Sequence, residues 1–394
     1  MSNKSHFFRQ SSGGGGDAFI ATFRTTSANE SITLPYLSNG TYSGTIDFGD
    51  GTVVANSYAN RTHTYVNSGD YDVTILGEIL YFSFEEVNIS RLNIVDVKQF
   101  GDIILGQSGT LSTQNGYAVF QSCTNLDISA TDTPDLSTLF NLRRFFRSCS
   151  ALVYNNSLND WDVSSVENLN SFFISANSIN VNINDWDVSN VTDMSYTFAT
   201  NSYNQPLNNW NTSSVITFFA TFNGATIFNQ PLNNWDVSSS LSMDLMFYNA
   251  KAFNQPLNDW DVSSVESFLS MFFGASDFNQ PLNNWNTSSV KTMKNMFFAT
   301  SDFNQDVSQW DYSSLNNVDS LNPFIRGVSP NYDTNYYDNL LIKWASSPSL
   351  GGLQPNIIGT IDMGTIKYTV NGASARASIL ANNKAQTIID GGQI

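Results

Sequence analysis

The sequence contains very few of the residues on which most hydrolytic and zinc sites depend. Among 394 residues there are two His, His6 and His63, and two Cys, Cys123 and Cys149. Neither His lies in the repeated region described below, which excludes Ser-His-Asp and Cys-His nucleophile arrangements from most of the chain. A zinc cluster of Cys and His is equally implausible. We therefore predict no catalytic residues, no metal site and no cofactor.

Basic residues and long apolar runs are scarce as well. The chain has 17 Lys and Arg against 34 Asp and Glu, a formal net charge of −17. Nucleic acid and anionic membrane surfaces would be repelled, so we expect neither as a partner. No stretch approaches the roughly 18 apolar residues of a spanning helix, and residues 1–16 lack the apolar centre of a secretory signal. We expect no membrane insertion and no signal peptide.

What the sequence does contain is a repeat marked by tryptophan. FNQPLNNWDVSS at 228–239 returns as FNQPLNDWDVSS at 253–264 and as FNQPLNNWNTSS at 278–289. The marker residues follow one another in steps of 24 or 25: Trp161, Trp186, Trp210, Trp235, Trp260, Trp285 and Trp310. A fixed period of this length is typical of a solenoid and lies in the leucine-rich-repeat range.

Each unit predicts a short inward-facing strand followed by a helical turn. In one unit Leu257, Trp260 and Val262 would face the core from the strand. The spacing of Val265, Phe268, Met271 and Phe272 then predicts one apolar face of a short helix, with a Ser at its N-terminus as cap. An Asn after each repeated aromatic residue predicts a ladder of bonds from coil to coil: Asn204, Asn229, Asn254, Asn279 and Asn304.

The outward residues of these strands are the candidate binding surface. They are amides and carboxylates on a regular grid, which suits sugar hydroxyls or polar protein surfaces; a merely solvated face is the alternative. The candidates are Asn208, Asn209, Asn211, Asn233, Asn234, Asp236, Asn258, Asp259, Asp261, Asn283, Asn284 and Asn286. The Trp column could be read as a sugar-stacking platform, but its position within the strand favours the core.

Residues 17–80 have the alternating pattern and Gly/Asp turns of a small β-sandwich. Asp47 and Asp50 could hold Ca²⁺, but capping of their own turns is favoured, and His63 is expected to pack in the sandwich. Cys123 and Cys149 fall in the small-residue column of adjacent units, where buried thiols are favoured and a disulfide stays open.

These motifs resemble a known family. The repeat W-D-V-S-x-V-x-x-M-x-x-M-F-x-x-A-x-x-F-N-Q-P-L-N is similar to that of the BspA-like leucine-rich-repeat surface proteins, and DFGDGT, HTY and SGDYDVTI resemble the immunoglobulin-like PKD module. The resemblance implies an α/β repeat solenoid, leucine-rich-repeat-like, of ~25-residue units on a parallel sheet, preceded by a small all-β immunoglobulin-like sandwich. It also implies a non-enzymatic surface protein used for adhesion, without catalytic residues to carry over.

The expected organisation has five parts. These are a tail at 1–16, a PKD-like sandwich at 17–80, a segment with degenerate repeats at 81–133, the solenoid at 134–327 and a C-terminal cap at 328–394. The cap is expected to include a helix over 336–345, a second helix near 373–382 and strands at 365–369 and 387–389.

The tail suggests a location. Phe7, Phe8 and Arg9 precede a Gly run and would suit a docking peptide followed by a flexible linker. We expect a recognition protein on a bacteriophage virion, anchored to other virion proteins through this tail and contacting a host-surface glycan or protein. A bacterial cell-surface adhesin and a purely structural virion protein are the alternatives, and a carboxylate-pair polysaccharide hydrolase is the least favoured.

Overall fold

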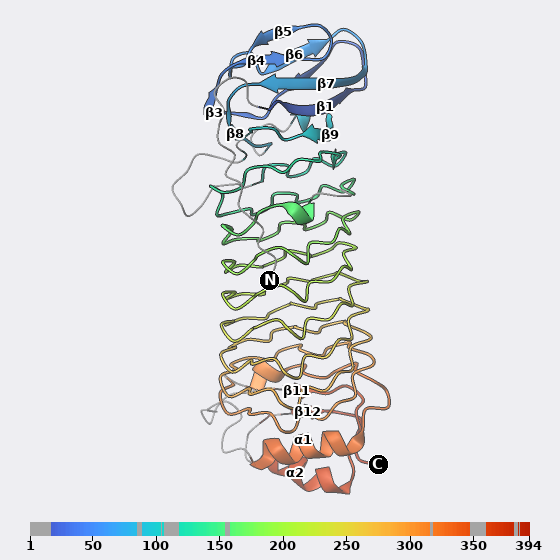
Figure 1. Ribbon diagram of the computed structural model, residues 1–394. Helices are drawn as coiled ribbons and strands as arrows, with labels where there is room; N and C mark the ends of the chain where they lie inside the picture. Colours follow the sequence, from blue (N-terminus) through green and yellow to red (C-terminus); the bar gives the residue numbers. More distant parts are fainter. Residues whose placement is uncertain are drawn as a thin grey trace.

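The computed structural model describes residues 17–84, 89–103, 105, 118–153, 158–315, 318–346, 360–381, 385 and 387–394. A group of sheets lies at one end, stacked coils follow, and two helices lie at the other end (Figure 1).

Eight strands make up the N-terminal part of the chain. They are β1 (Phe19–Thr25), β2 (Glu30–Thr33), β3 (Tyr36–Tyr42), β4 (Thr45–Asp47), β5 (Val53–Ala55), β6 (Thr62–Tyr65), β7 (Gly69–Leu76) and β8 (Ile79–Phe82). β2 pairs with β6 and β3 with β8, both antiparallel, while β1, β7, β4 and β5 belong to a larger sheet. Phe19 and Phe23 of β1, and Phe48 directly after β4, are buried.

The larger sheet takes strands from both sides of residue 80. A 3₁₀ turn η1 (Ile89–Leu92) leads into β9 (Ile94–Gln99), which pairs antiparallel with β1, and β10 (Asp127–Ile128) pairs parallel with β9. The six-stranded order is β10-β9-β1-β7-β4-β5. The sheet is therefore mixed, and through β10 it leads directly into the first coils.

The predicted α/β leucine-rich-repeat-like solenoid with a parallel sheet is wrong. Among the described residues, α-helix is confined to the C-terminal end, and the sheet of more than two strands is the mixed N-terminal one. The segment from Leu257 to Val262, expected as a strand, consists of turns and irregular backbone. The repeated units are instead coils that contact one another through single parallel bridges, such as Ser242 to Ser267 and Ser267 to Thr292.

The apolar spacing that predicts a helix arises here from consecutive turns. The N–H of Met271 donates to the carbonyl of Phe268 at 3.2 Å, and the N–H of Ala275 to that of Phe272 at 3.0 Å. The alternate residues donate to the next coil instead, as Ser270 does to Lys294 at 2.8 Å. Because every second N–H is used between coils, the backbone does not close into a helix, and the predicted Ser caps have no helix to cap.

This backbone places ordinary residues in the left-handed region. One such residue occurs ten positions after each Trp from 161 to 285: Ser171, Tyr196, Ala220, Leu245, Ser270 and Asn295. A non-glycine residue is disfavoured there by about 1–2 kcal/mol. Each of these conformations points an N–H along the stack; the N–H of Leu245, for example, donates to the carbonyl of Leu269 at 2.9 Å. The inter-coil bonds therefore offset the local strain.

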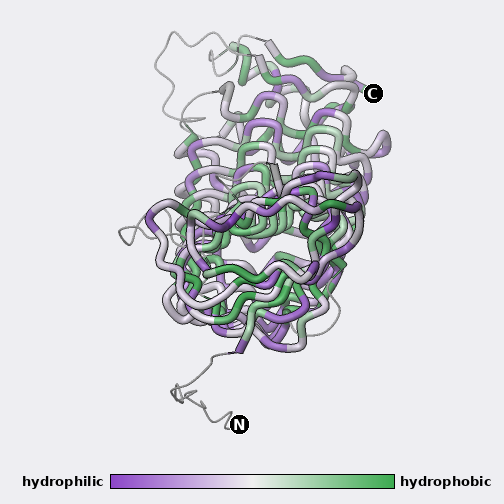
Figure 2. Tube along the Cα trace, turned by 90° about the horizontal axis from the view of Figure 1, so that it is seen from above, coloured by the Kyte–Doolittle hydropathy of each residue, from purple (hydrophilic) through white to green (hydrophobic). Residues whose placement is uncertain are grey.

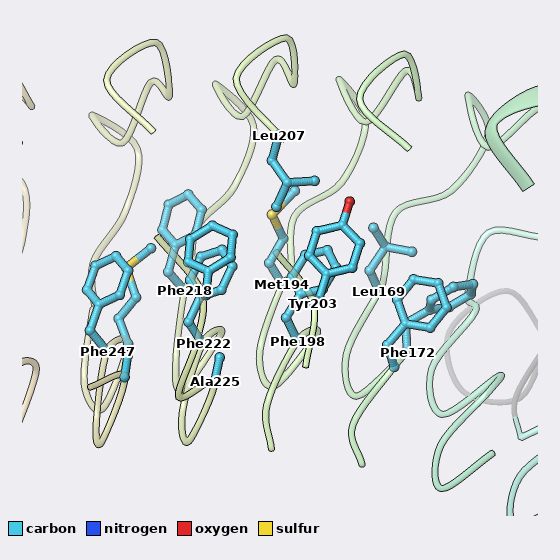
Figure 3. Packing of buried hydrophobic residues seen from close by; sticks show 14 of the residues in the cluster. Leu169, Phe172, Met194, Phe198, Tyr203, Leu207, Phe218, Phe222, Ala225 and Phe247 are labelled. Atoms are coloured by element: carbon cyan, nitrogen blue, oxygen red, sulfur yellow. The ribbon is translucent and has the colours of Figure 1, made fainter. Parts of the chain in front are cut away.

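The Trp column is buried, as predicted. The seven repeat Trp side chains are 0–4% exposed. Neighbouring rings lie parallel, with Trp210 and Trp235 centroids 6.2 Å apart at 4°. Figure 3 shows Phe198, Phe222 and Phe247 in successive coils, and consecutive ring centroids lie 5.5 and 5.6 Å apart. Phe198 and Phe222 also contact the Trp column, with centroids 5.8 Å from Trp210 and 5.9 Å from Trp235 respectively. This burial excludes the sugar-stacking platform.

The predicted Asn ladder is confirmed. The Oδ1 of Asn229 accepts the N–H of Asn254 at 3.0 Å, and the Oδ1 of Asn254 accepts that of Asn279 at 3.0 Å. The same oxygen of Asn254 also accepts from the Nε2 of Gln280 at 3.0 Å. The FNQ motif therefore supplies both an acceptor and two donors for the connection between coils.

The C-terminal segment covers the last coil. Short turns η2 (Leu158–Asp160) and η3 (Val318–Leu321) lie within the stack, and after it come α1 (Thr334–Ser346), β11 (Thr360–Asp362), α2 (Val370–Ala381) and β12 (Thr387–Ile389). The two predicted helices and the strand at 387–389 are present, whereas the strand expected at 365–369 is absent and β11 lies at 360–362 instead. Trp344 of α1 packs edge-on against Tyr312, at 5.8 Å.

Three smaller expectations are also met. Cys123 and Cys149 are free, buried thiols, and the Sγ of Cys149 donates to the Phe120 carbonyl at 2.9 Å. Asp47 and Asp50 cap their own turns, accepting the N–H groups of Gly49 and Thr52 at 2.9 and 3.0 Å. His63 stacks on Phe48 at 4.4 Å.

Candidate functional site

The twelve candidate binding residues flank the buried Trp of four successive coils. Asn208 and Asn258 are half-buried, and the remaining ten are exposed. We call these twelve residues the polar face. Viewed from above, hydrophilic and hydrophobic segments are interspersed along the stacked coils (Figure 2).

Two of these residues connect neighbouring coils. The Oδ1 of Asn208 accepts the backbone N–H of Asn234 at 3.1 Å, and the Oδ1 of Asn258 accepts that of Asn284 at 3.0 Å. Earlier in the stack the Oδ1 of Asn184 accepts the N–H of Asn209 at 3.0 Å. These bonds fix the register of the face from one coil to the next.

The residue after each Trp closes a turn. The Oδ1 of Asp236 and of Asp261 accepts the N–H two residues on, from Ser238 and Ser263, at 3.0 Å in both cases. Asn211 and Asn286 make the same bond in their own coils, at 3.2 and 3.1 Å. Asp and Asn are interchangeable for this bond because each offers an oxygen acceptor. That equivalence accounts for the alternation of WDVSS and WNTSS in the sequence.

The residue before each Trp keeps its side chain at the surface. Asn209, Asn234, Asp259 and Asn284 occupy this position and are all exposed. Their backbone N–H groups, rather than their side chains, make the inter-coil bonds at Asn209, Asn234 and Asn284. Amides and carboxylates repeated at one position per coil can donate to and accept from a polar ligand.

The coils that carry this face also carry a family signature. The family described as "Mycoplasma protein of unknown function, DUF285" matches residues 114–232, 186–275 and 220–334, which together span more than half of the chain. The chain belongs to this family. No curated protein and no solved structure matches it significantly.

In this DUF285 protein the inter-coil role of tryptophan was missed by sequence reasoning. The indole N–H of Trp235 donates to the Leu207 carbonyl at 2.9 Å, and that of Trp260 donates to the Leu232 carbonyl at 3.0 Å. The signal was the spacing of an apolar residue three positions before each Trp, which is Leu in five of the seven units. The carbonyl of that residue accepts the backbone N–H of its own Trp and the indole N–H of the Trp one coil later. Trp therefore supports the polar face both by packing and by a hydrogen bond.

A groove on the N-terminal sheet was missed as well. It has a volume of about 690 Å³ and is lined by residues of β1, β7, β9 and β10. Arg24 pairs with Asp70 at 2.7 Å and Lys98 with Asp72 at 2.8 Å along it. Hydrogen bonds from Arg24 lower the pKa of Asp70, and those from Lys98 and Thr22 lower the pKa of Asp72. Carboxylates that stay ionised in this way are poorly suited to act as general acids.

The remaining expectations concern the N-terminal anchor, metal ligands and membrane-spanning helices. Phe7, Phe8 and Arg9 of the expected anchor lie outside the described residues. In the part of the chain that the structure describes, no three His, Cys, Asp or Glu side chains are grouped so that they could hold a metal ion. None of the helices described there has the length and apolar character needed to cross a membrane.

The turn carboxylates should make the stack sensitive to acid. Hydrogen bonds from the hydroxyl and N–H of Ser263 lower the pKa of Asp261, and Ser313 lowers that of Asp311 in the same way. A folded pKa below the unfolded value of about 3.9 means that stability is full above that pH and is lost as pH falls through the folded pKa. The urea concentration needed to unfold the protein should therefore decrease progressively below about pH 4.

The matched variant is Asp261→Asn, because Asn286 already makes this turn bond one coil later. We expect the variant to unfold at a similar urea concentration at pH 7 and to depend less on pH between 2 and 4. An unchanged pH dependence would contradict a role for this carboxylate.

Proposed function

We propose that this protein is a non-enzymatic recognition protein, displayed on a phage virion and contacting a glycan or protein of the host surface through the polar face. The observation that supports this is the repetition of exposed amides and carboxylates at one fixed position in four successive coils. A rigid array of this kind gains affinity from many weak polar contacts without reordering its own backbone. The acidic net charge of −17 disfavours nucleic acid as the ligand.

The tail is proposed to hold the protein on its assembly. Phe7, Phe8 and Arg9 would dock onto another virion protein, and the Gly run after them would act as a linker. A bacterial cell-surface adhesin remains the second candidate, since the same polar face would serve there. Immunogold labelling of intact particles and of cells distinguishes the two locations.

The binding surface can be tested with one compound variant. Asn209, Asn234, Asp259 and Asn284 are changed together to Ala, which leaves the backbone N–H groups of the inter-coil bonds in place. We expect wild-type protein to bind a subset of a bacterial glycan array or of intact bacterial cells. The variant should lose at least tenfold in affinity, because each truncated polar contact removes about 0.5–1.5 kcal/mol.

The control carries Ala at Asp277 and Asp302, two exposed residues that do not belong to the polar face. It should bind like wild type. Binding by the four-fold variant equal to wild type would assign recognition to another surface. Release of reducing sugar ends from the arrayed glycans would support the hydrolase instead.

A further inference from the structure

A second outward surface of the coils is apolar rather than polar. Tyr248, Phe273 and Phe298 occupy one equivalent position in three successive coils, thirteen residues after each Trp, and all three are half-buried. Their rings are stacked, with centroids 4.6 Å apart between Tyr248 and Phe273 and 4.8 Å apart between Phe273 and Phe298. The guanidinium of Arg326 lies 5.9 Å from the Phe298 centroid at the end of this column.

A column of mixed character runs beside this aromatic stack. Four residues earlier in the same three coils stand Asp244, Leu269 and Lys294, of which Lys294 is exposed and the other two are half-buried. Met246 and Phe247, between the two columns of the first coil, are buried. Both columns therefore lie on the same outer side, and we call these six residues the aromatic face.

The backbone beneath this face is held from coil to coil. The N–H of Leu245 donates to the Leu269 carbonyl at 2.9 Å, and the N–H of Asn249 donates to the Phe273 carbonyl at 2.7 Å. One coil later, the N–H of Gly274 donates to the Phe298 carbonyl at 2.8 Å. The face is consequently a regular, pre-formed surface, and partly exposed aromatic residues on such a surface are characteristic of binding sites between proteins.

The order of charges on this face is self-complementary. Along the stack the first column reads acidic, apolar and basic, and within the described part of the chain neither Asp244 nor Lys294 forms an ion pair. The Oδ1 of Asp244 accepts the hydroxyl of Ser267 and the N–H of Leu269, which leaves its Oδ2 for a partner across the interface. Consider a two-fold axis that lies in the interface, runs perpendicular to the stack and passes through the middle coil. It would bring Asp244 of each copy opposite Lys294 of the other, which gives two such pairs. Leu269 and Phe273 would then meet their own copies at the centre, as in an isologous interface.

We propose that this face binds a second copy of the chain in antiparallel orientation. The aromatic side chains form the desolvated centre of the contact, and the two Asp244–Lys294 pairs fix its direction. A parallel arrangement would place Asp244 opposite Tyr248 and would pair no charges. Because each copy carries a net charge of −17, general repulsion opposes association, and the specific pairing decides whether it occurs.

Charge reversal provides the test, measured by sedimentation equilibrium of the full chain. Wild type should show a monomer–dimer equilibrium. Lys294→Asp should weaken dimerisation at least tenfold, since it places Asp opposite Asp, and Asp244→Lys should do so by placing Lys opposite Lys. Mixing these two variants should restore dimers, now as heterodimers, because every pair is again of opposite charge. The double variant should likewise dimerise by itself.

The controls have the same net charge as the variants. Lys291→Asp matches Lys294→Asp, and Asp187→Lys matches Asp244→Lys; both positions are exposed and lie outside the aromatic face and the polar face. Lys291→Asp also removes an exposed ion pair with Glu266, at 2.6 Å. They should dimerise like wild type. Asp244 accepts the N–H of Leu269 at 2.9 Å, so Asp244→Lys could fail to fold, which circular dichroism would reveal. In that case Phe273→Lys, which places two Lys side chains against each other at the centre, replaces it and should abolish dimers.

Three outcomes would overturn the proposal. One is a wild-type protein that remains monomeric at all accessible concentrations. The second is a dimer that is unaffected by Lys294→Asp or Phe273→Lys. The third is equal weakening by Lys291→Asp and Lys294→Asp, which would show that net charge alone is responsible.

Discussion

Replacing Trp235 with Ala should lower the free energy of unfolding by about 3–5 kcal/mol, the usual cost of deleting a large buried side chain. The ring is 3% exposed and lies parallel to Trp210, with centroids 6.2 Å apart. It also contacts Phe218, at 5.5 Å. Truncation would leave a cavity between coils that cannot close without shifting the inter-coil bonds. Urea unfolding followed by far-ultraviolet circular dichroism measures the change.

Two further variants separate packing from hydrogen bonding at this position. Trp235→Phe keeps an aromatic ring but removes the donor to the Leu207 carbonyl, and it should cost less than Trp235→Ala. Asn234→Ala, at the exposed neighbouring residue, should change stability by no more than about 0.5 kcal/mol. A loss below about 1 kcal/mol for Trp235→Ala would show that this column does not support the stack.

The period of the sequence was sufficient to predict which residues are buried but not how the backbone runs. Trp at every 24th or 25th position can face a common core only if successive coils are in register, so the burial of Trp and the Asn ladder followed from spacing alone. The apolar spacing of Phe268 and Met271 is shared by a helix and by a chain of three-residue turns. The choice between them depends on the N–H of Ser270, whose partner is the Lys294 carbonyl in another coil. Local patterns contain no information about such a partner.

The two surfaces also differed in how far the sequence could predict them. The polar face could be predicted because Asn and Asp beside a buried Trp must point outward. The aromatic face could not, because the predicted apolar helix face included Phe272 and gave no role to its neighbour Phe273. In the structure Phe272 is buried and Phe273 is half-buried, since the left-handed residues Ser270 and Gly274 turn pairs of side chains alternately inward and outward. Sequence periodicity of helix or strand type does not describe that pattern.

The last prediction concerns the Asn ladder, where two chemically similar bonds differ in burial. Asn254→Ala removes an oxygen that accepts from the N–H of Asn279 and from the Nε2 of Gln280, both at 3.0 Å. Two donors would be left without this partner at a half-buried position. An unsatisfied buried donor costs about 1–3 kcal/mol, so we expect a loss of roughly 2 kcal/mol in urea unfolding.

Asn258→Ala is the matched control within the same coil. Its Oδ1 accepts a backbone N–H of the next coil, that of Asn284, at the same 3.0 Å. Asn284 is exposed, so water can replace the lost acceptor and the cost should remain below about 1 kcal/mol. Asn254→Asp, which keeps an oxygen acceptor, should lose less than Asn254→Ala. Equal losses at 254 and 258 would show that burial does not distinguish the two ladders.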